Sequence, residues 1–508
     1  MFLFHFQLTT MKTSIFIITV MMFHASIFGQ RHDNNWIIGY DLESNASLSE
    51  TMLVSFNSSP PSIVNWPVAL DFNTTTLTVS DAEGNLIFFT NGIQIHDASD
   101  NLMLGGDSLN AGQLAYENWD NGYPAFEGIQ ALPTGNDIYF LFHVRGEWET
   151  EPVVPELLFT VVDMKLNGGH GEVIQKNQLV KIGQNYEFPA ATRHANGRDW
   201  WVVSPELYQN KIFTCLVTPY GVADTTTQTI GYKPPAPDSI GVGQNFFSPD
   251  GTTYVDLDFL NGVRIYDFDR CTGMLSNFRQ IPASIAPKTL GGAISPNSRY
   301  LYITADDAYL VLQFDLQAND IAASMDTVAV YDGFMQGPFE SIFTFMRLAP
   351  DGKIYINTNT RHFHVINSPD TKGLDCDVRQ HYLPLPQEPL LIPVYPNYRL
   401  GPIDGSPCDT LGLDVAAGEE QAPEEETSNF SIAPNPAQEL LNLTGQVPLH
   451  GDTTWELFNS LGGNAMKIRL PPGSQHQTIA LHGLAVGIYY YKVASDGKTV
   501  QSGKLIIN

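Results

Sequence analysis

The sequence predicts an all-β protein in which a β-propeller is followed by a small Ig-like β-sandwich. One layout recurs six times between residues 36 and 410: an apolar strand, a Gly- or Pro-containing turn, a second strand and a third strand. The turn glycines fall at positions 84, 135, 197, 251 and 352, and Ser298 takes the equivalent place in the fifth copy. A repeat of about 50 residues is typical of a four-stranded propeller blade. We expect seven blades, with six or eight as alternatives.

The clearest copy runs from residue 246 to residue 269. Its first strand ends at Ser248-Pro249-Asp250-Gly251, a turn sequence in which Pro fixes φ and Gly accepts a positive φ. Residues 255–259 then alternate between apolar and acidic side chains, which is the period of a half-buried strand. Asn261-Gly262 is a strong hairpin signal and precedes the returning strand at residues 263–268.

Two segments remain at the ends of the repeat region. Residues 36–40 precede the first copy, and residues 382–400 follow the last one. We expect these segments to complete a seventh blade together, because a closed ring leaves no exposed sheet edge at the seam.

The repeat region resembles known propellers. The Ser-Pro-Asp-Gly turns are similar to those of WD-repeat and related propellers, in which the strand before the turn is innermost. The region also resembles a family of exported bacterial proteins with large propeller regions and no established activity. The matching pieces are Asn35 to Gly39, Asp81 to Leu86, Phe268 to Gly273 and Pro396 to Pro402. None of them is a catalytic signature, so the resemblance concerns architecture.

The N-terminal residues 1–29 predict a secretory signal peptide. Lys12 precedes an apolar run at residues 15–23 that is too short to span a bilayer, and small residues follow at Ser26 and Gly29. Cleavage after Gly29 would leave Gln30 as the first residue. No later apolar run reaches membrane-spanning length, so we expect an exported protein without a membrane-spanning segment.

The composition excludes one class of partner. The chain has 508 residues and a formal net charge of −28, from 54 acidic and 26 basic residues. Nucleic-acid binding needs a basic surface, so we expect no nucleic-acid partner. An acidic balance of this size more often serves solubility.

The chain has four cysteines, which in an exported protein suggest disulfides with three possible connectivities. We favour Cys376 with Cys408 and Cys215 with Cys271. No Cys-x-x-Cys or paired Cys/His spacing predicts a metal site. We therefore predict no metal and no cofactor, and leave a structural cation in the propeller channel as an alternative.

The last part of the chain predicts a separate domain. Residues 411–428 read as an acidic linker, because they combine Glu and Pro with few apolar side chains. Residues 429–508 contain several short strands separated by turn signals, as in a small β-sandwich.

This last domain resembles the type A C-terminal sorting domain of the type IX secretion system. The resemblance is carried by Pro434-Asn435-Pro436, by Gly487-Ile488-Tyr489 and by the terminal stretch that begins at Gly503-Lys504. It implies that the secretion machinery is a partner and that the protein reaches the cell surface or the medium. An ordinary Ig-like accessory domain is the alternative.

A candidate ligand site comes from the connections that precede several inner strands. Each carries an acid or an amide beside an aromatic residue, and in a propeller these connections converge on one channel mouth. We expect Glu127, Glu187, Gln244 and Glu340 to ring that mouth, with Trp119 or Trp148 as a stacking surface for a cation or sugar ligand. The alternative is that these polar residues only satisfy backbone groups around the channel.

The sequence contains no known catalytic signature, neither Gly-x-Ser-x-Gly nor His-Glu-x-x-His, and we assign no catalytic residue. The favoured function is an extracellular binding module for a glycan, a protein or another ligand. One alternative is a hydrolase or lyase that acts on a polysaccharide or a lactone. A second is a structural adhesion or matrix protein.

Overall fold

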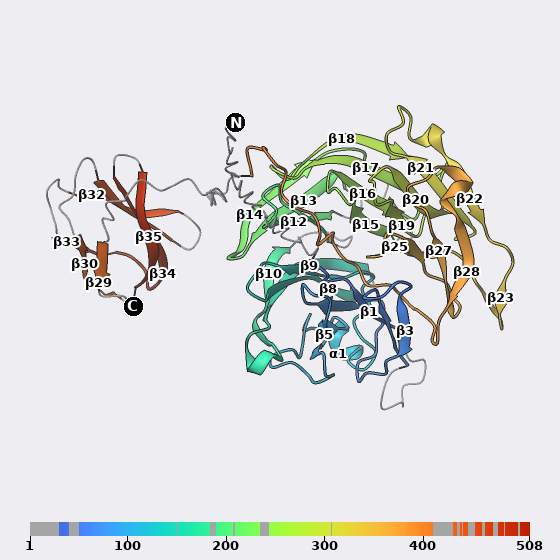
Figure 1. The fold of residues 1–508 in the computed structure, drawn as a ribbon, viewed down its shortest axis with the longest axis horizontal. Coiled ribbons are helices and arrows are strands. Elements are labelled where there is room, and N and C mark those ends of the chain that lie inside the picture. Colours follow the sequence, from blue (N-terminus) through green and yellow to red (C-terminus); the bar gives the residue numbers. More distant parts are fainter. Residues whose placement is uncertain are drawn as a thin grey trace, which may run out of the picture. The chain divides into compact units, whose positions relative to one another are not determined.

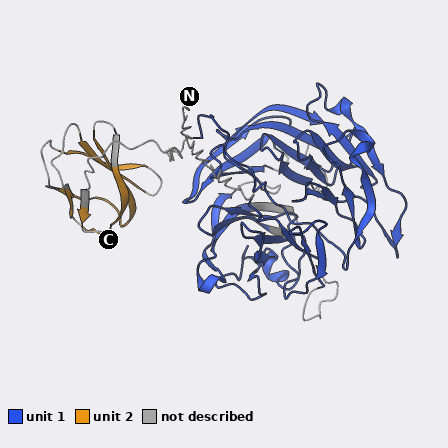
Figure 2. Cartoon of the chain, in the orientation of Figure 1, with its two compact units in different colours: residues 1–411 blue, residues 412–508 orange. Residues whose placement is uncertain are grey.

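The fold was analysed in a computed structural model of the whole chain. It describes residues 30–39, 50–149, 151–182, 189–206, 209–233, 243–305 and 307–409, and eight shorter stretches between residues 430 and 507. The predicted signal peptide, at residues 1–29, and the whole predicted linker, at residues 411–428, lie outside the described residues. The chain divides into two compact units, residues 1–411 and 412–508 (Figure 2).

The first unit is a β-propeller of seven antiparallel sheets that follow one another around a common centre (Figure 1). Each sheet keeps its strands in chain order. The sheets are β1–β3 (Asn35–Ile38, Met52–Ser55, Ser62–Asn65), β4–β6 (Leu77–Ser80, Leu86–Thr90, Ile95–Asp97), β7–β10 (Ile129–Pro133, Ile138–Glu149, Glu151–Asp163, Glu172–Ile182), β11–β14 (Ala190–Arg193, Trp200–Pro205, Lys211–Thr218, Gly221–Thr229), β15–β18 (Gly243–Phe247, Thr253–Asp258, Gly262–Asp269, Met274–Ile281), β19–β22 (Gly292–Ile294, Tyr300–Ala305, Leu310–Asp315, Asp326–Val330) and β25–β28 (Met346–Leu348, Ile354–Ile356, His362–Ile366, Val378–Pro384).

Few other elements interrupt this order in the described part of the unit. They are the short helix α1 (Gln113–Glu117), the hairpin β23–β24 (Met335–Gln336, Phe339–Glu340) and the 3-10 turns η1 (Asn167–Gly169), η2 (Ala322–Ser324) and η3 (Gly373–Cys376). The first strands of neighbouring sheets contact one another, as β11 does with β15 and β15 with β19. The first strand of each sheet is therefore the innermost, as the sequence predicts.

The turn after β15 shows why the repeat folds as it does. The Ser248 hydroxyl donates to Asp250 Oδ1 (2.5 Å), and Ser248 Oγ accepts the backbone N–H of Thr253 (2.9 Å). Gly251 has a φ of 73°, and a Cβ at this position would lie 2.5 Å from Thr192 Oγ1 in the neighbouring sheet. Only glycine meets both demands without strain.

The apolar core lies between neighbouring sheets. Val255 and Leu257 of β16 pack in one cluster with Leu301 and Ile303 of β20. The same arrangement joins the two ends of the ring, where β1 and β2 pack against the last sheet. That cluster contains Trp36, Ile38, Met52, Val54, Phe56, Ala349, Tyr355, Phe363, Val365, Leu385 and Ile392, all buried.

The expected route to the seventh blade is wrong, although the number of blades is confirmed. β1 pairs with β2 and not with residues 382–400. β28, which ends at Pro384, is instead the outermost strand of its own sheet and pairs with β27. The first and last sheets therefore share no strand among the described residues, and side-chain packing closes the ring.

Residues 390–408 form a strap that crosses one end of the central channel (orange trace after β28 in Figure 1). Along the strap, side chains and backbone groups bond to five different sheets of the ring. The bonds are Asn357 Nδ2 to Leu390 O (2.8 Å), Tyr395 Oη to Thr78 O (2.8 Å), Tyr398 Oη to Ala131 O (2.8 Å), Asn397 Nδ2 to Pro249 O (2.7 Å) and Ile403 N to Ala195 O (2.9 Å). The strap thus fastens sheets that do not touch one another.

Both predicted disulfides are wrong, because the strap carries the chain away from the last sheet. Cys408 is bonded to Cys271, in the turn between β17 and β18, with a Cα–Cα distance of 5.5 Å. Cys215 and Cys376 are free and buried. Cys215 lies in the core between two sheets with Trp200 and Phe213, and burial raises the pKa of the Cys376 thiol to about 11.

The second unit is a β-sandwich. One sheet contains β29 (Phe430–Ala433), β30 (Leu440–Gly445) and β33 (His476–Ala480), and the other contains β32 (Asn464–Leu470), β31 (Thr453–Phe458), β34 (Gly487–Ser495) and β35 (Lys498–Ile507). Alternate residues of β31 are buried, as expected for a strand with one face on the core. The core contains Trp455, Leu457, Val493 and Leu505.

We expect a non-reducing peptide map of the mature protein to contain one disulfide-linked pair, Cys271 with Cys408. Cys215→Ser and Cys376→Ser should leave that pair intact, because both thiols are buried apart from it. The Cys271→Ser/Cys408→Ser double variant should lose about 2–4 kcal/mol of unfolding free energy, the usual contribution of a native disulfide. A linked peptide containing Cys376 and Cys408 would contradict the path of the strap.

Candidate functional site: the channel and the strap pocket

Three side chains from separate parts of the ring meet inside the central channel. Glu127, in the connection before β7, accepts hydrogen bonds at Oε1 from Gln244 Nε2 of β15 and from an Nη of Arg347 of β25. Gln244 Oε1 in turn accepts the backbone N–H of Gly292 (2.6 Å). The Glu127 side chain is 3% exposed and that of Arg347 is 11% exposed. The channel is therefore crossed by a buried ion pair.

The surroundings of Glu127 are unusual for a carboxylate. Burial raises the pKa of Glu127 above its ordinary value, against the opposing effects of Arg347 and Gln244. In the described structure, Oε2 has no hydrogen-bond partner. The backbone of Glu127 has a φ of 52°, in the left-handed region that non-glycine residues rarely adopt. Such strain often marks a position that the surrounding structure holds firmly.

The structure brings two of the predicted mouth residues together and separates a third from them. Glu127 and Gln244 are bonded to each other inside the channel, whereas Glu340 lies on the hairpin β23–β24 and accepts a hydrogen bond from the Tyr309 hydroxyl (2.7 Å). Trp119 follows α1 and is 38% exposed. Glu187 and the side chain of Trp148 lie outside the described residues. As a ligand site, this set stays a prediction.

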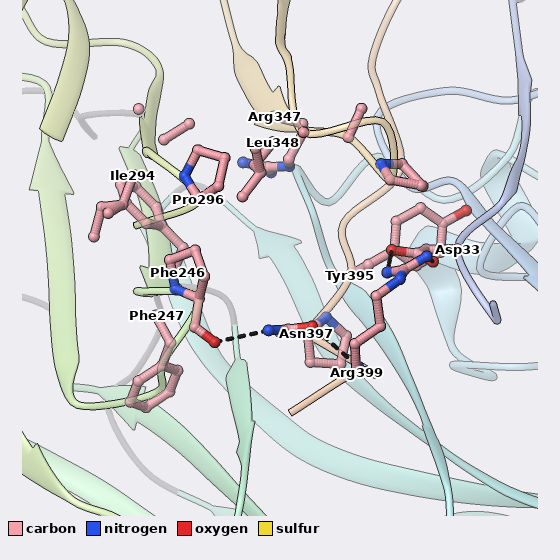
Figure 3. A pocket seen from close by; sticks show the side chains of 17 residues that line it. Asp33, Phe246, Phe247, Ile294, Pro296, Arg347, Leu348, Tyr395, Asn397 and Arg399 are labelled. Atoms are coloured by element: carbon pink, nitrogen blue, oxygen red, sulfur yellow. Dashed lines mark hydrogen bonds and ion pairs between the residues drawn. The ribbon is translucent and has the colours of Figure 1, made fainter. Parts of the chain in front are cut away.

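A pocket of about 290 Å³ lies at the channel end that the strap crosses (Figure 3). It is formed where the inner strands β15, β19 and β25 turn back, and the N-terminal segment and the strap complete it. We call it the strap pocket. Its lining residues are Asp33, Phe246, Phe247, Pro249, Gly292, Ala293, Ile294, Pro296, Arg347, Leu348, Ala349, Pro350, Gly352, Tyr395, Pro396, Asn397 and Arg399.

The two sides of the strap pocket differ in chemistry. Figure 3 shows Phe246, Ile294 and Pro296 on one side, and Asp33 and Arg399 on the opposite side. The first side is apolar and belongs to the blades, while the second is polar and belongs to the two ends of the propeller chain. The pocket is therefore amphipathic.

The polar side is built on an ion pair between the chain ends. Arg399 of the strap donates from both Nη atoms to the two carboxylate oxygens of Asp33 (2.8 and 2.7 Å), and one of them also donates to Asn34 Oδ1 (2.9 Å). Asp33 is 11% exposed in this pair. A planar bidentate pair of this kind fixes both position and orientation.

Arg347 links the strap pocket to the buried ion pair. Its side chain lines the pocket near Leu348, and the same guanidinium is bonded to Glu127 in the channel. Sequence reasoning identified Glu127 and Gln244 but not Arg347, Asp33 or Arg399. The stretch Pro396 to Pro402, noted for its resemblance to other exported propellers, was the one signal that pointed to the strap.

In the second unit, the structure places only some of the predicted sorting residues. Pro434, Asn435 and Pro436 lie outside the described residues. Ala437, which follows them, donates its backbone N–H to Ile506 O (2.7 Å) in the last strand. Gly487 and Tyr489 belong to β34, and Gly503 and Lys504 belong to the paired strand β35. The two ends of the sorting motif are thus brought together.

Gly503 has a physical reason to be glycine. It pairs with Tyr491 across the two strands, and a Cβ at Gly503 would lie 2.5 Å from the Tyr491 hydroxyl oxygen and 2.7 Å from its Cζ. The aromatic ring therefore lies across the strand where only glycine leaves room. Lys504, the next residue, is exposed.

The described residues contain no group of three or more His, Cys, Asp or Glu side chains placed to hold a metal ion. They also contain no helix with the length and apolar character needed to cross a membrane.

We expect that removing one partner of the channel ion pair lowers the unfolding free energy strongly, whereas replacing both partners with apolar side chains lowers it little. Glu127→Ala should lower the unfolding free energy by about 3–5 kcal/mol, because Arg347 would stay buried without its counter-ion. The Glu127→Leu/Arg347→Met double variant should recover most of that loss. Chemical denaturation of the mature chain measures both.

An exposed ion pair provides the control for this prediction. Lys372 and Asp326 are 59% and 39% exposed and 3.8 Å apart, so Asp326→Ala should cost about 1 kcal/mol or less. If Glu127→Ala cost no more than Asp326→Ala, the described burial of the pair would be wrong.

Comparison with known proteins identifies the second unit. Residues 431–508 match the family model described as the secretion system C-terminal sorting domain. No curated protein sequence matches the chain.

Solved structures resemble the chain at low similarity. A provisionally assigned 6-phosphogluconolactonase of Bacteroides uniformis is 12% identical, with a TM-score of 0.45, over 71% of this chain and 99% of that chain. The periplasmic gluconolactonase of Pseudomonas aeruginosa is 14% identical, with a TM-score of 0.41, over 70% of this chain and 98% of that chain. The fold given above rests on the sheet topology of this chain and not on these likenesses.

Such a domain is recognised by the type IX secretion machinery and indicates export across the outer membrane. The match covers the same part of the chain as the resemblance found in the sequence. The chain is therefore a β-propeller protein that carries a type IX C-terminal sorting domain and is exported to the cell surface or the medium.

Proposed function

We propose that the exported propeller is a glycan-binding module and that its ligand occupies the strap pocket. The observation that carries this proposal is the amphipathic character of the pocket, with an apolar side at Phe246 and Ile294 and a polar side at Asp33 and Arg399. A sugar ring has the same two-sided character, because its C–H groups form apolar faces and its hydroxyls surround the edge. Apolar walls with a few well-placed polar groups are typical of small-molecule sites.

The size of the pocket supports a short recognition element. Its volume of about 290 Å³ is just below the usual range for ligand pockets, about 300–1,000 Å³. A pocket of this size suits one terminal sugar unit better than a long stretch of polymer. Export adds to the argument, because it delivers the pocket to the outside of the cell.

The lining residues favour binding over hydrolysis. Glycosidases typically use two carboxyl groups that flank the scissile bond. Among the described lining residues, Asp33 is the one carboxylate, and Arg399 holds both of its oxygens. Glu127 is bonded to Arg347 behind the pocket wall. Arg399 therefore occupies both oxygens of Asp33, and Glu127 is not among the residues that line the pocket.

We expect the mature protein to be retained by at least one member of a panel of immobilised polysaccharides, without turnover. Leu348→Trp should abolish that retention, because Leu348 lines the pocket and the larger side chain would fill it. Affinity electrophoresis on the panel, with reducing-end assays for turnover, provides both measurements.

Leu374→Trp is the matched control. Leu374 lies in η3 and is 76% exposed, so the same substitution there should leave retention unchanged. If the Leu348→Trp variant is still retained, the ligand binds elsewhere than in the strap pocket. Turnover that is lost with Leu348→Trp would support the hydrolase alternative instead.

A further inference from the structure

We infer that the ligand of the strap pocket is a neutral saccharide, and that the Asp33–Arg399 pair makes the pocket select against acidic sugars. This inference rests on the proposed glycan-binding function and adds the chemical class of the sugar. It follows from the charged side chains that line the pocket, because each of them already forms an ion pair with another side chain of the protein.

The first matched pair is on the polar side of the pocket. Both Nη atoms of Arg399 are bonded to Asp33, and one of them also serves Asn34. The fork of N–H groups that arginine offers to a carboxylate or a sulfate is therefore already occupied. Arg399 cannot bind an acidic sugar in the same way without releasing Asp33.

The second matched pair is at the top of the pocket in Figure 3. Arg347 lines the pocket, and its guanidinium is bonded to Glu127 and to the carbonyl oxygen of Met346 (3.1 Å). Its positive charge is thus compensated inside the channel. Asp33, Arg347 and Arg399 are the charged residues among the described lining residues, so none of the charges that line the pocket lacks a partner.

This balance penalises a charged ligand and leaves room for a neutral one. A uronate would bring a further negative charge beside Asp33, whose side chain is 11% exposed, with no free cation to meet it. A partly buried, unpaired charge is costly. A sugar hydroxyl faces no such cost, since it can donate to a remaining lone pair of Asp33 and accept from an arginine N–H.

The alternative is that the two ion pairs only hold the ring together. In that case the pocket would have no preference between neutral and acidic sugars, or would bind acidic sugars through exposed N–H groups. The two possibilities differ in what they predict for substitution of Asp33.

The test uses pairs of tetrasaccharides that differ only at C6. The probes are glucose, galactose and mannose tetrasaccharides and the uronates of the same linkage, titrated by calorimetry into the mature full-length protein. We expect the neutral member of any bound pair to bind at least about tenfold more tightly, a difference in binding free energy of about 1.4 kcal/mol. Neutral binding should also change little between low and high salt, because no net charge is matched.

Asp33→Asn tests the assigned residue. It keeps a hydrogen-bond acceptor for Arg399 but removes the negative charge, so the uronate should gain affinity and the preference should shrink or reverse. Asp315→Asn is the matched control. Asp315 forms a similar bidentate pair with Arg299 (3.1 and 2.8 Å) outside the pocket, so the preference should be unchanged there.

Each outcome decides between the claims. A uronate that binds the unsubstituted protein more tightly than its neutral counterpart, or equally well, overturns this inference and leaves the glycan-binding function standing. A neutral preference that persists in a folded Asp33→Asn variant overturns the role of Asp33. No binding of any of the six probes overturns the proposed function together with the inference. If Asp33→Asn does not fold, the salt dependence and the C6 preference of the unsubstituted protein still decide the class of sugar.

Discussion

The ring of seven sheets depends on how its two ends are held together. The first and last sheets share no strand among the described residues, so closure relies on the apolar contact around Trp36 and Tyr355 and on the strap. Within the strap, Arg399 forms a bidentate ion pair with Asp33 of the N-terminal segment, which holds the two ends of the propeller chain together. The same pair forms the polar side of the strap pocket. Ring closure and the proposed ligand binding therefore share one set of contacts, because both ends of the propeller chain line the pocket.

Much of the fold could be predicted from the sequence, because it is set by local chemistry. The Ser-Pro-Asp-Gly turn with Gly251 and the Asn261-Gly262 hairpin signal are properties of a few neighbouring residues, and the structure contains both as expected. The expected half-buried strand is wrong, because β16 is buried on both faces and Asp256 forms a buried ion pair with Arg264. Repetition then predicts the ring, since one small sheet cannot bury both of its faces. The sorting domain was predictable for a similar reason, because its resemblance lies in short stretches of neighbouring residues.

The parts that could not be predicted depend on contacts between distant residues. The disulfide prediction chose partners that are near in sequence, whereas the strap carries Cys408 to Cys271, 137 residues away. Glu127 was expected at an open mouth, but its surroundings are set by Arg347, 220 residues away. The sequence pattern of one chain does not indicate which distant residues will lie close together in the fold. The residues of the strap pocket come from the N-terminal segment, three blades and the strap, so the pocket also had no local pattern.

Hydrogen exchange at the seam of the ring tests most directly whether the strap holds the propeller closed. In Arg399→Ala, we expect backbone amides of β1 and β25 to exchange faster than in the unsubstituted protein, while those of β16 and β17 stay protected. Arg299→Ala, which breaks a similar pair within one blade, should leave the seam unchanged. Seam amides that stay as protected in Arg399→Ala as in the unsubstituted protein would contradict closure by the strap.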